Sequence, residues 1–328
     1  MTISSAEFEV PDRMRAAVID AFGDPKDVMH VSTVPVPDIG DDEVLIRVAA
    51  AGVGAWDQEL CEGAFGKDGD FPRVLGSDCA GTIVGMGPEV HRFNLRDRVY
   101  AWGFLNPKGG FFAEYAVVPE EDVSSVPPSL STEEAAVLAV DGLTALAGLD
   151  QVETRRGQKL MILGASGGVG HLAIQLAKRF GARVFAVASG ADGLDLVRRV
   201  GADVAIDGRD PGSDVAAAAH AFAPDGLDAA LVLASGDAVG ALALVRRGGR
   251  IAYANGVQPE PEAPPGVEIE AFDGYSGHEA LERLNRMVEL SPFHVEVSRE
   301  YPLDAAPDAV TAATKHHIGK LAVAIKPH

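Results

Sequence analysis

The chain has 328 residues, of which 47% are hydrophobic and 23% are charged, a composition typical of a folded globular protein. Its length exceeds the size at which a single hydrophobic core keeps growing, so two domains are expected. Acidic residues number 48 and basic residues 28, and the resulting formal charge of −20 repels phosphate backbones and anionic lipids. We therefore expect neither a nucleic acid nor a membrane surface as a partner.

The two cysteines, Cys61 and Cys79, are too few for a disulfide framework or for the clustered thiolates of a structural zinc site. They are expected to be small buried residues in a protein of the reducing cytoplasm. The N-terminal region has no basic segment followed by an apolar run, and no stretch approaches the roughly 20 apolar residues that span a bilayer. The sequence thus indicates neither secretion nor membrane insertion.

The first third of the chain, residues 15–126, consists of short apolar alternations interrupted by glycine and proline, a pattern that predicts a β-rich domain. Pro127 and Pro128 end this region. Ser131 lies three residues before Glu134 and precedes apolar positions at helical spacing, so a helix is expected to begin near Ser131.

From Lys159 onward, apolar strands alternate with amphipathic helices. This alternation predicts a parallel sheet that helices cover on both faces. The expected strands are 160–163, 182–189, 203–207, 226–234, 249–256 and 267–274, and the expected helices are 171–180, 193–201, 214–223, 238–248 and 278–290. The C-terminal segment returns to short strands, and we expect it to rejoin the first domain.

A glycine-rich loop lies between the first of these strands and its helix. Its residues are Gly164, Ala165, Ser166, Gly167, Gly168, Val169 and Gly170. Gly167 lets the backbone approach a pyrophosphate, Gly170 lets the helix pack on the strand, and the N–H groups at the helix start favour an anion. Because the loop stands between a strand and a helix within repeated βαβ units, it predicts dinucleotide binding.

With this loop and the following HLAIQLAKRFGARV, the chain resembles the medium-chain dehydrogenase/reductase superfamily, in its zinc-independent quinone oxidoreductase branch. The segments EVLIRVAAAGV, VLGSDCAGTIVGMGPEV, GGFFAEYAVV and HHIGKLAVAI are also similar to that branch and follow its usual order. The resemblance implies a central Rossmann domain, a doubly wound parallel sheet, at 127–270. It also implies a β-rich, GroES-like barrel catalytic domain at 1–126 and 271–328, with the active site between the two domains.

The expected cofactor is NADPH. The second strand of the Rossmann domain ends at Ser189, where NAD-specific sites usually carry an acidic residue. Asp192 is expected to face solvent, and Arg209 is either a clamp for the 2′-phosphate or an ordinary surface arginine. The resemblance also implies cofactor contacts for the loop, at Ala165, Ser166, Gly167, Gly168, Val169 and Gly170, and for Thr144, Ser189, Ala234, Ser235, Asn255 and Gly256. Gly208 stands where the family often has an aromatic residue.

No catalytic zinc is expected. Zinc-dependent relatives hold the metal with a cysteine at the position of Gly54 and with a His-Glu pair, where this chain has Ser77 and Asp78. Ser77 cannot replace an imidazole ligand. Asp141 lies near a later ligand position, but a solvated or hydrogen-bonded carboxylate is the simpler reading.

For the substrate pocket, the sequence offers the aromatic residues Trp56, Tyr100 and Trp102, whose faces could stack on a planar acceptor. Tyr100 is also the candidate catalytic residue, because its phenol could donate a hydrogen bond or a proton. Packing in the hydrophobic core is the alternative for all three. His316 is either close to the cofactor or simply exposed.

Without a metal to stabilise an alkoxide, transfer of hydride from NADPH to a quinone, an enone or a similar activated alkene or carbonyl compound is favoured over alcohol oxidation. Two alternatives stay open: an enoyl reductase of a polyketide-like pathway, and a non-catalytic NADPH-binding redox sensor. The expected partners are a small-molecule substrate and, by resemblance, a second copy of the chain that pairs through the edge strand near 267–274.

Overall fold

The computed structural model describes residues 10–66, 71–235, 239–290 and 292–326. The chain divides into two compact units, which we call the barrel unit and the Rossmann unit. The barrel unit consists of Met1–Val140, Ser276–Glu282 and Val297–His328, and the Rossmann unit consists of Asp141–Tyr275 and Arg283–Glu296. In both units, segments that are distant in the sequence fold together.

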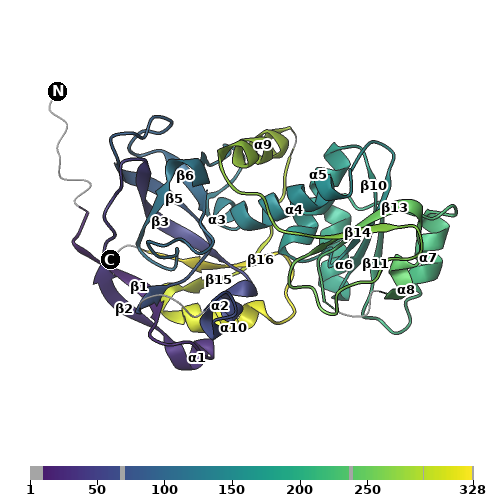
Figure 1. Ribbon diagram of the computed structural model, residues 1–328, viewed down its shortest axis with the longest axis horizontal. Coiled ribbons are helices and arrows are strands. Elements are labelled where there is room, and N and C mark those ends of the chain that lie inside the picture. Colours follow the sequence, from purple (N-terminus) through teal and green to yellow (C-terminus); the bar gives the residue numbers. More distant parts are fainter. Residues whose placement is uncertain (1–9, 67–70, 236–238, 291, 327–328) are drawn as a thin grey trace. The chain divides into compact units, whose positions relative to one another are not determined.

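Within the described part of the Rossmann unit, six parallel strands form one sheet (Figure 1). Their spatial order is β11 (Val204–Asp207), β10 (Arg183–Ala188), β9 (Lys159–Leu163), β12 (Leu227–Val232), β13 (Val245–Ala254) and β14 (Glu268–Phe272). The order reverses direction at β9, as in doubly wound sheets that bind ligands beyond the carboxyl ends of their strands.

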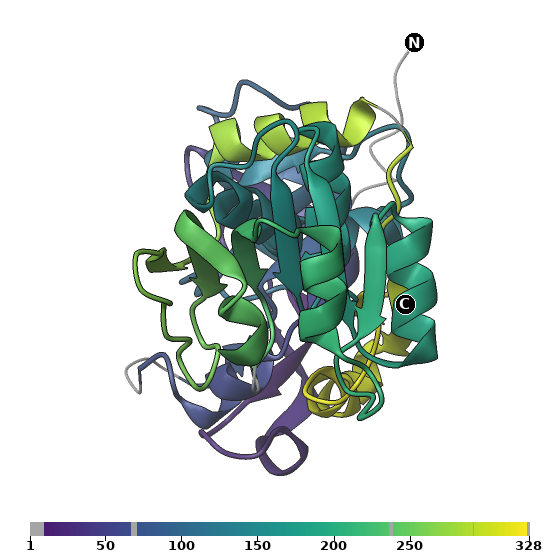
Figure 2. The same ribbon diagram turned by 90° about the vertical axis from the view of Figure 1, so that its right-hand side faces the viewer.

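Helices pack against this sheet (Figure 2). They are α4 (Ala139–Gln151), α5 (Gly168–Arg179), α6 (Gly190–Arg199), α7 (Val215–Phe222) and α8 (Val239–Leu242). A further helix, α9 (His278–Glu289), is tied to α4 by the ion pair of Arg283 with Asp150. Phe222 of α7 packs with Met161 and Phe185 in one buried cluster, so α7 covers one face of the sheet. Each fully buried side chain of this size stabilises the fold by roughly 1.5–3 kcal/mol.

In the barrel unit, the described strands form two sheets. The smaller sheet has the order β2 (Met29–Pro35), β1 (Arg13–Ile19) and β4 (Arg73–Val74). The larger sheet has the order β15 (Val297–Pro302), β16 (Lys320–Ala324), β3 (Glu43–Val53), β5 (Asp78–Met86), β6 (Arg98–Trp102) and β8 (Val123–Ser125), and β7 (Tyr115–Pro119) also pairs with β3. The parallel pairing of β15 with β16, and the antiparallel pairing of β16 with β3, join the C-terminal segment to the sheet of the barrel unit.

Short helices complete the barrel unit. They are α1 (Pro25–Val28), α2 (Trp56–Glu62), α3 (Thr132–Ala136) and α10 (Ala306–Ala313), with 3₁₀ turns at Glu120–Asp122 and Leu303–Ala305. The predicted start of a helix near Ser131 is confirmed: the Ser131 side chain accepts from the Glu134 N–H, and the Glu134 carboxylate accepts from the Ser131 N–H. No helix in the described ranges is both long enough and apolar enough to cross a bilayer.

The predicted fold class is confirmed, although two details of the chain differ from the expectation. Residues 127–140 fold with the barrel unit rather than the Rossmann unit, because α3 packs on β3, β5 and β6. The helix expected over 238–248 is wrong in its second half, since β13 already begins at Val245. Val245 pairs with Leu227, and this pairing in the sheet overrides the local helical pattern.

Candidate functional site

The glycine-rich loop of the Rossmann unit connects β9 to α5. Gly164 has a φ of +79°, a left-handed conformation that glycine adopts without strain. A Cβ atom added at Gly170 would lie 2.3 Å from the carbonyl oxygen of Gly164 and 2.7 Å from Cα of Ala165. The first turn of α5 therefore packs directly on the loop, and only glycine fits at position 170.

Gly167 differs from Gly170 in its surroundings. It is the N-cap residue of α5, and a Cβ atom added there would contact only the carbonyl oxygen of Gly164, at 3.5 Å, apart from its chain neighbours. The described residues thus leave open the space above Gly167, where the positive end of the helix dipole and the N–H groups of the first turn favour an anion. This geometry fits the pyrophosphate of a dinucleotide.

The other predicted cofactor residues lie mostly beyond the carboxyl ends of the same parallel strands. Ser189 follows β10, Arg209 follows β11, Ala234 and Ser235 follow β12, and Asn255 and Gly256 follow β13. The Ser235 hydroxyl accepts a hydrogen bond from the Gln258 N–H at 3.0 Å, which ties two of these loops together. Thr144 lies instead on α4, where it is half-buried beside Gly274.

At the start of α6, the side chain of Ser189 makes no capping hydrogen bond. The cap comes from the neighbouring strand: Asp207 Oδ2 accepts from the Gly190 N–H at 3.0 Å. Asp192 is exposed, as expected, and its carboxylate accepts from the Gly193 N–H. Arg209 is also exposed, so its guanidinium is accessible to a ligand in solution.

The barrel unit contains a buried charged cluster where β3, β5 and β16 meet. Lys320 Nζ lies 2.7 Å from Asp78 Oδ2, and the two side chains are 3% and 0% exposed. The same ammonium group lies 4.8 Å from the centre of the Trp56 ring, within the range of a cation–π contact. Burying a charge is costly unless it is paired, and here the lysine and the aspartate pair with each other.

Asp57 is the second carboxyl group of this cluster. Its Oδ2 accepts a hydrogen bond from the Gly54 N–H at 2.8 Å, whereas its buried Oδ1 has no hydrogen-bond partner among the described residues. Burial raises the pKa of Asp57 to about 7; the Gly54 hydrogen bond opposes this, the Asp78 carboxylate raises it further, and Lys320 lowers it. This carboxyl group therefore titrates near neutral pH.

Trp56 fills the space that a side chain at Gly54 would need. A Cβ atom added at Gly54 would lie 2.3 Å from Cζ2 of the Trp56 ring. The indole Nε1–H then donates to Ser77 Oγ at 3.0 Å. The two positions where zinc-dependent relatives carry ligands thus hold a glycine and a hydroxyl group, both in contact with one indole ring. Within the described residues, no three His, Cys, Asp or Glu side chains are grouped so that they could hold a metal ion.

Ser77 also lines a cavity of about 690 Å³ within the barrel unit. Apolar side chains form much of its wall, among them Leu60, Phe65, Leu75 and Leu105. Phe65 is supported by an edge-to-face contact with Phe104, at a ring distance of 5.1 Å. The cavity has the size and the apolar lining typical of a small-molecule site.

The three predicted aromatic residues have different environments. Trp56 and Trp102 are half-buried, and Trp102 pairs with Asp78 across β5 and β6. Tyr100 is completely buried and is hydrogen-bonded to Ser124, and burial raises its pKa well above the usual range. This position favours the alternative of core packing, so we do not carry Tyr100 forward as a catalytic group.

The sequence analysis did not single out Asp57 or Lys320 as site residues. Lys320 lies 242 positions from Asp78, so only the pairing of β16 with β3 brings the two together. Asp141, read as solvated or hydrogen-bonded, is buried. Both cysteines are buried free thiols, and burial raises the pKa of Cys61 to about 12, which agrees with an inert role.

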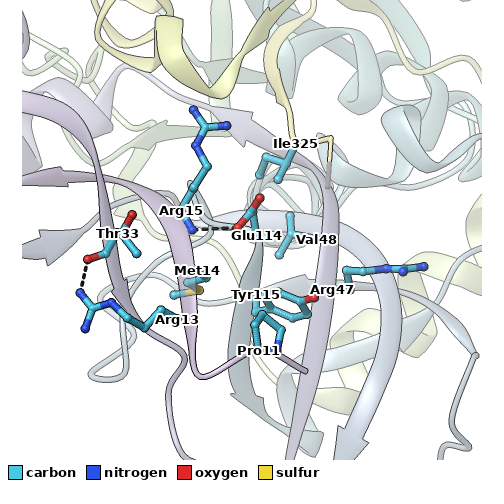
Figure 3. Close-up of a pocket in the computed structure, with 10 residues that line it drawn as sticks. All are labelled: Pro11, Arg13, Met14, Arg15, Thr33, Arg47, Val48, Glu114, Tyr115 and Ile325. Atoms are coloured by element: carbon cyan, nitrogen blue, oxygen red, sulfur yellow. Dashed lines mark hydrogen bonds between the residues drawn. The ribbon is translucent and has the colours of Figure 1, made fainter. Parts of the chain in front are cut away.

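A second cavity, of about 190 Å³, lies between β1, β3 and β7 of the barrel unit (Figure 3). Arg13, Arg15 and Arg47 contribute to its lining, but their guanidinium groups point in different directions. Arg13 donates to the carbonyl oxygen of Thr33, and Arg15 pairs with Asp304. The charges do not converge on one ligand, so we do not assign a site there.

Comparison with known proteins agrees with both units. Residues 40–128 match the family described as alcohol dehydrogenase GroES-like domain, and residues 168–272 match the family described as zinc-binding dehydrogenase. An NADPH-dependent alkenal/one oxidoreductase of Arabidopsis thaliana is 31% identical over 97% of this chain and 81% of its own length.

Solved structures give the same result. The quinone oxidoreductase of Coxiella burnetii has a TM-score of 0.81 at 27% identity, over 96% of this chain and 100% of that one. The structure of an NAD-dependent alcohol dehydrogenase has a TM-score of 0.86 at 29% identity, over 95% of this chain and 100% of that one. The chain therefore belongs to the medium-chain dehydrogenase/reductase superfamily, among the relatives of the quinone and alkenal oxidoreductases.

Proposed function

We propose that this protein is an NADPH-dependent reductase of enones, quinones or similar activated acceptors, and that it works without a catalytic zinc ion. The observation that carries the proposal is the contact of the Trp56 ring with Gly54 and Ser77, which fills the region where zinc-dependent relatives hold their metal. Without a metal Lewis acid, an acceptor that is already activated by conjugation is the favoured substrate.

The bound nicotinamide cofactor would supply the hydride. The chain itself contributes binding and orientation: the loop at Gly167 and the first turn of α5 receive the pyrophosphate, and the carboxyl ends of β12 and β13 receive the rest of the dinucleotide. In the barrel unit, the apolar cavity beside Ser77 suits a planar, weakly polar acceptor. The names of the Arabidopsis and Coxiella relatives, which refer to alkenals and quinones, support this substrate class.

NADPH is proposed over NADH on two grounds. The residue after β10 is the uncharged Ser189, and the exposed Arg209 follows the neighbouring strand β11. A 2′-phosphate would meet the guanidinium of Arg209 there, whereas an acidic residue at position 189 would repel it. The Arabidopsis relative is named as NADPH-dependent.

We also propose that the protein is a cytoplasmic homodimer. Its free thiols suit a reducing compartment. Among the described strands, β14 pairs with β13 alone and forms the edge of the sheet, and Glu268, Glu270 and Ala271 on it are exposed. Such an edge can extend a sheet across a two-fold axis. A light-scattering mass equal to one chain at micromolar concentration would contradict the dimer.

The function is tested by titrating the purified protein with NADPH and with NADH, and then adding a panel of enones, quinones and aldehydes. The proposal predicts tighter binding of NADPH and oxidation of the cofactor only when an enone or quinone is present. NADPH binding with no oxidation by any acceptor would favour a sensor, and turnover confined to carrier-bound enoyl thioesters would favour a biosynthetic enoyl reductase.

A further inference from the structure

We propose that Ser77 is a catalytic residue that donates a hydrogen bond to the carbonyl oxygen of the acceptor, and that the indole of Trp56 is the positioning residue that orients it. This inference rests on the proposed function and deepens it, because it names the polar contact that would recognise the substrate. It concerns the barrel unit alone.

The first step of the argument is the hydrogen-bonding state of the Ser77 hydroxyl group. Its oxygen accepts from Trp56 Nε1–H at 3.0 Å. Among the described residues, none accepts the proton of this hydroxyl. The Trp56 hydrogen bond occupies one side of the oxygen and leaves the O–H group to turn toward another acceptor. A hydroxyl group that itself accepts a hydrogen bond is a stronger donor, because hydrogen bonds in a chain polarise one another.

The second step is the cavity. Ser77 is only 1% exposed, yet it lines the cavity of about 690 Å³. The other polar side chains of the wall have partners: the Asn106 amide donates to the carbonyl oxygen of Val117, and the Lys108 ammonium group binds Glu43. The guanidinium of Arg73 lies over the ring of Phe22, at 5.5 Å from its centre. Ser77 differs from these three in being buried, so its hydroxyl group can donate to a ligand in the part of the wall that is shielded from water.

The third step is the support behind Trp56. Gly54 provides the room for the indole ring, and Lys320 lies against the ring at 4.8 Å. Lys320 in turn is fixed by Asp78, the residue that follows Ser77. The indole is therefore held between a glycine and a buried ion pair, and its N–H group keeps a constant direction toward Ser77.

The chemistry follows from this arrangement. When a hydride adds to the β-carbon of a conjugated carbonyl compound, negative charge develops on the carbonyl oxygen. A fixed donor in an apolar cavity stabilises that charge more than it stabilises the neutral ground state. Ser77 supplies this hydrogen bond without transferring its own proton, and the proton that completes the reduction comes from water.

The test uses the full-length protein and p-dimethylaminocinnamaldehyde, an enal whose absorption moves to longer wavelength when its carbonyl oxygen accepts a hydrogen bond. Spectra are recorded with oxidised cofactor, so that binding is read without turnover, and kcat/KM is measured separately with NADPH. The variants are Ser77→Ala, Ser77→Thr, Trp56→Phe and the double variant Ser77→Ala/Trp56→Phe. Circular dichroism and urea melts verify that each variant is folded.

We expect Ser77→Ala to abolish the spectral shift and to lower kcat/KM by roughly 10- to 100-fold, mainly through kcat. Ser77→Thr keeps the hydroxyl group and should keep the shift. Trp56→Phe should reduce the shift, and the double variant should equal Ser77→Ala, because Trp56 acts through Ser77.

A Ser77→Ala protein that retains both the shift and a kcat/KM within about twofold of the wild type would overturn the inference. So would a wild-type protein that reduces enones but does not shift the probe; in that case the proposed function stands and the role of Ser77 does not. A wild-type protein that shifts the probe but reduces no acceptor would refute the proposed function and the catalytic role of Ser77, leaving only a contact to the ligand.

Discussion

Lys320 Nζ and Asp78 Oδ2 lie 2.7 Å apart with almost no solvent exposure, although the two residues are 242 positions apart in the sequence. Their ion pair joins β16, at the end of the chain, to the start of β5. It also supports the Trp56 indole. The pair therefore links the stability of the barrel unit to the geometry of the candidate substrate site.

Lys320→Met is expected to destabilise the protein by about 3–5 kcal/mol, because it leaves the Asp78 carboxylate buried without its cation. The matched control is Lys26→Met. Lys26 and Asp308 form an exposed pair at 3.5 Å, and such pairs contribute about 0–1 kcal/mol. Urea denaturation measures both variants, and equal effects of the two would contradict the role of the buried pair.

The raised pKa of Asp57 predicts a specific pH dependence of the free energy of unfolding. The folded protein holds a proton on Asp57 up to about pH 7, whereas the unfolded chain releases it near the ordinary aspartate pKa of 3.8. The contribution of Asp57 to stability is therefore fully present below the unfolded pKa, and it is lost as the pH rises through the folded pKa, by at most about 1.4 kcal/mol per pH unit.

Asp57→Asn should remove this pH dependence of the free energy of unfolding. As the pH rises from 5 to 7, which is about two units below the folded pKa up to that pKa, the variant should therefore gain stability relative to the wild type. Urea melts across this range measure the difference, and the exposed Asp27→Asn variant is the control. A difference between Asp57→Asn and the wild type that stays constant with pH would show that Asp57 is ionised throughout.

Two glycine-to-alanine changes in the cofactor loop should have different consequences. Gly170→Ala places a Cβ atom 2.3 Å from the carbonyl oxygen of Gly164, so it should lower both stability and cofactor binding. The added methyl group of Gly167→Ala meets no such obstacle, so the free energy of unfolding of this variant should lie within about 1 kcal/mol of that of the wild type. Its methyl group nevertheless stands where the pyrophosphate would approach, and we expect at least a roughly 10-fold weaker NADPH affinity. Thermal melts and fluorescence titration separate the two effects, and unchanged binding by Gly167→Ala would place the pyrophosphate elsewhere.

Arg209→Ala is expected to weaken NADPH binding by roughly 5- to 10-fold and to leave NADH binding unchanged, because only NADPH carries the 2′-phosphate. Arg198→Ala is the control, since Arg198 is an exposed residue of α6 that pairs with Asp195. Equal losses for NADPH and NADH would assign Arg209 to another part of the cofactor.

Much of the fold could be predicted from local patterns, because the βαβ alternation and the Ser131 capping box each involve residues close in the sequence. The start of β13 at Val245 could not be predicted, since its pairing with Leu227 is a tertiary effect. The cofactor loop was recognisable because one continuous segment forms it. The cluster of Asp57, Asp78 and Lys320 was not, because α2, β5 and β16 assemble it from distant parts of the sequence and only its burial makes the charges noteworthy.

The aromatic candidates illustrate the same limit. From the sequence, Trp56, Tyr100 and Trp102 were equally good candidates for the substrate pocket. Only the direction of each side chain in the structure distinguishes them. Tyr100 points into the core beside Ser124, whereas Trp56 donates to Ser77 at the wall of a cavity. Tyr100 lies on β6 and Trp56 begins α2, so the packing of two different elements decides between these outcomes.

The most direct test of the central claim is a single-turnover reaction of the purified protein with NADPH and a simple enone, in the presence of excess metal chelator. We predict that the absorbance of the reduced nicotinamide is lost only when protein and enone are both present, and that the product has a saturated carbon–carbon bond and an intact carbonyl group. Tight NADPH binding without oxidation by enones or quinones, or activity that the chelator abolishes, would contradict a zinc-independent reductase.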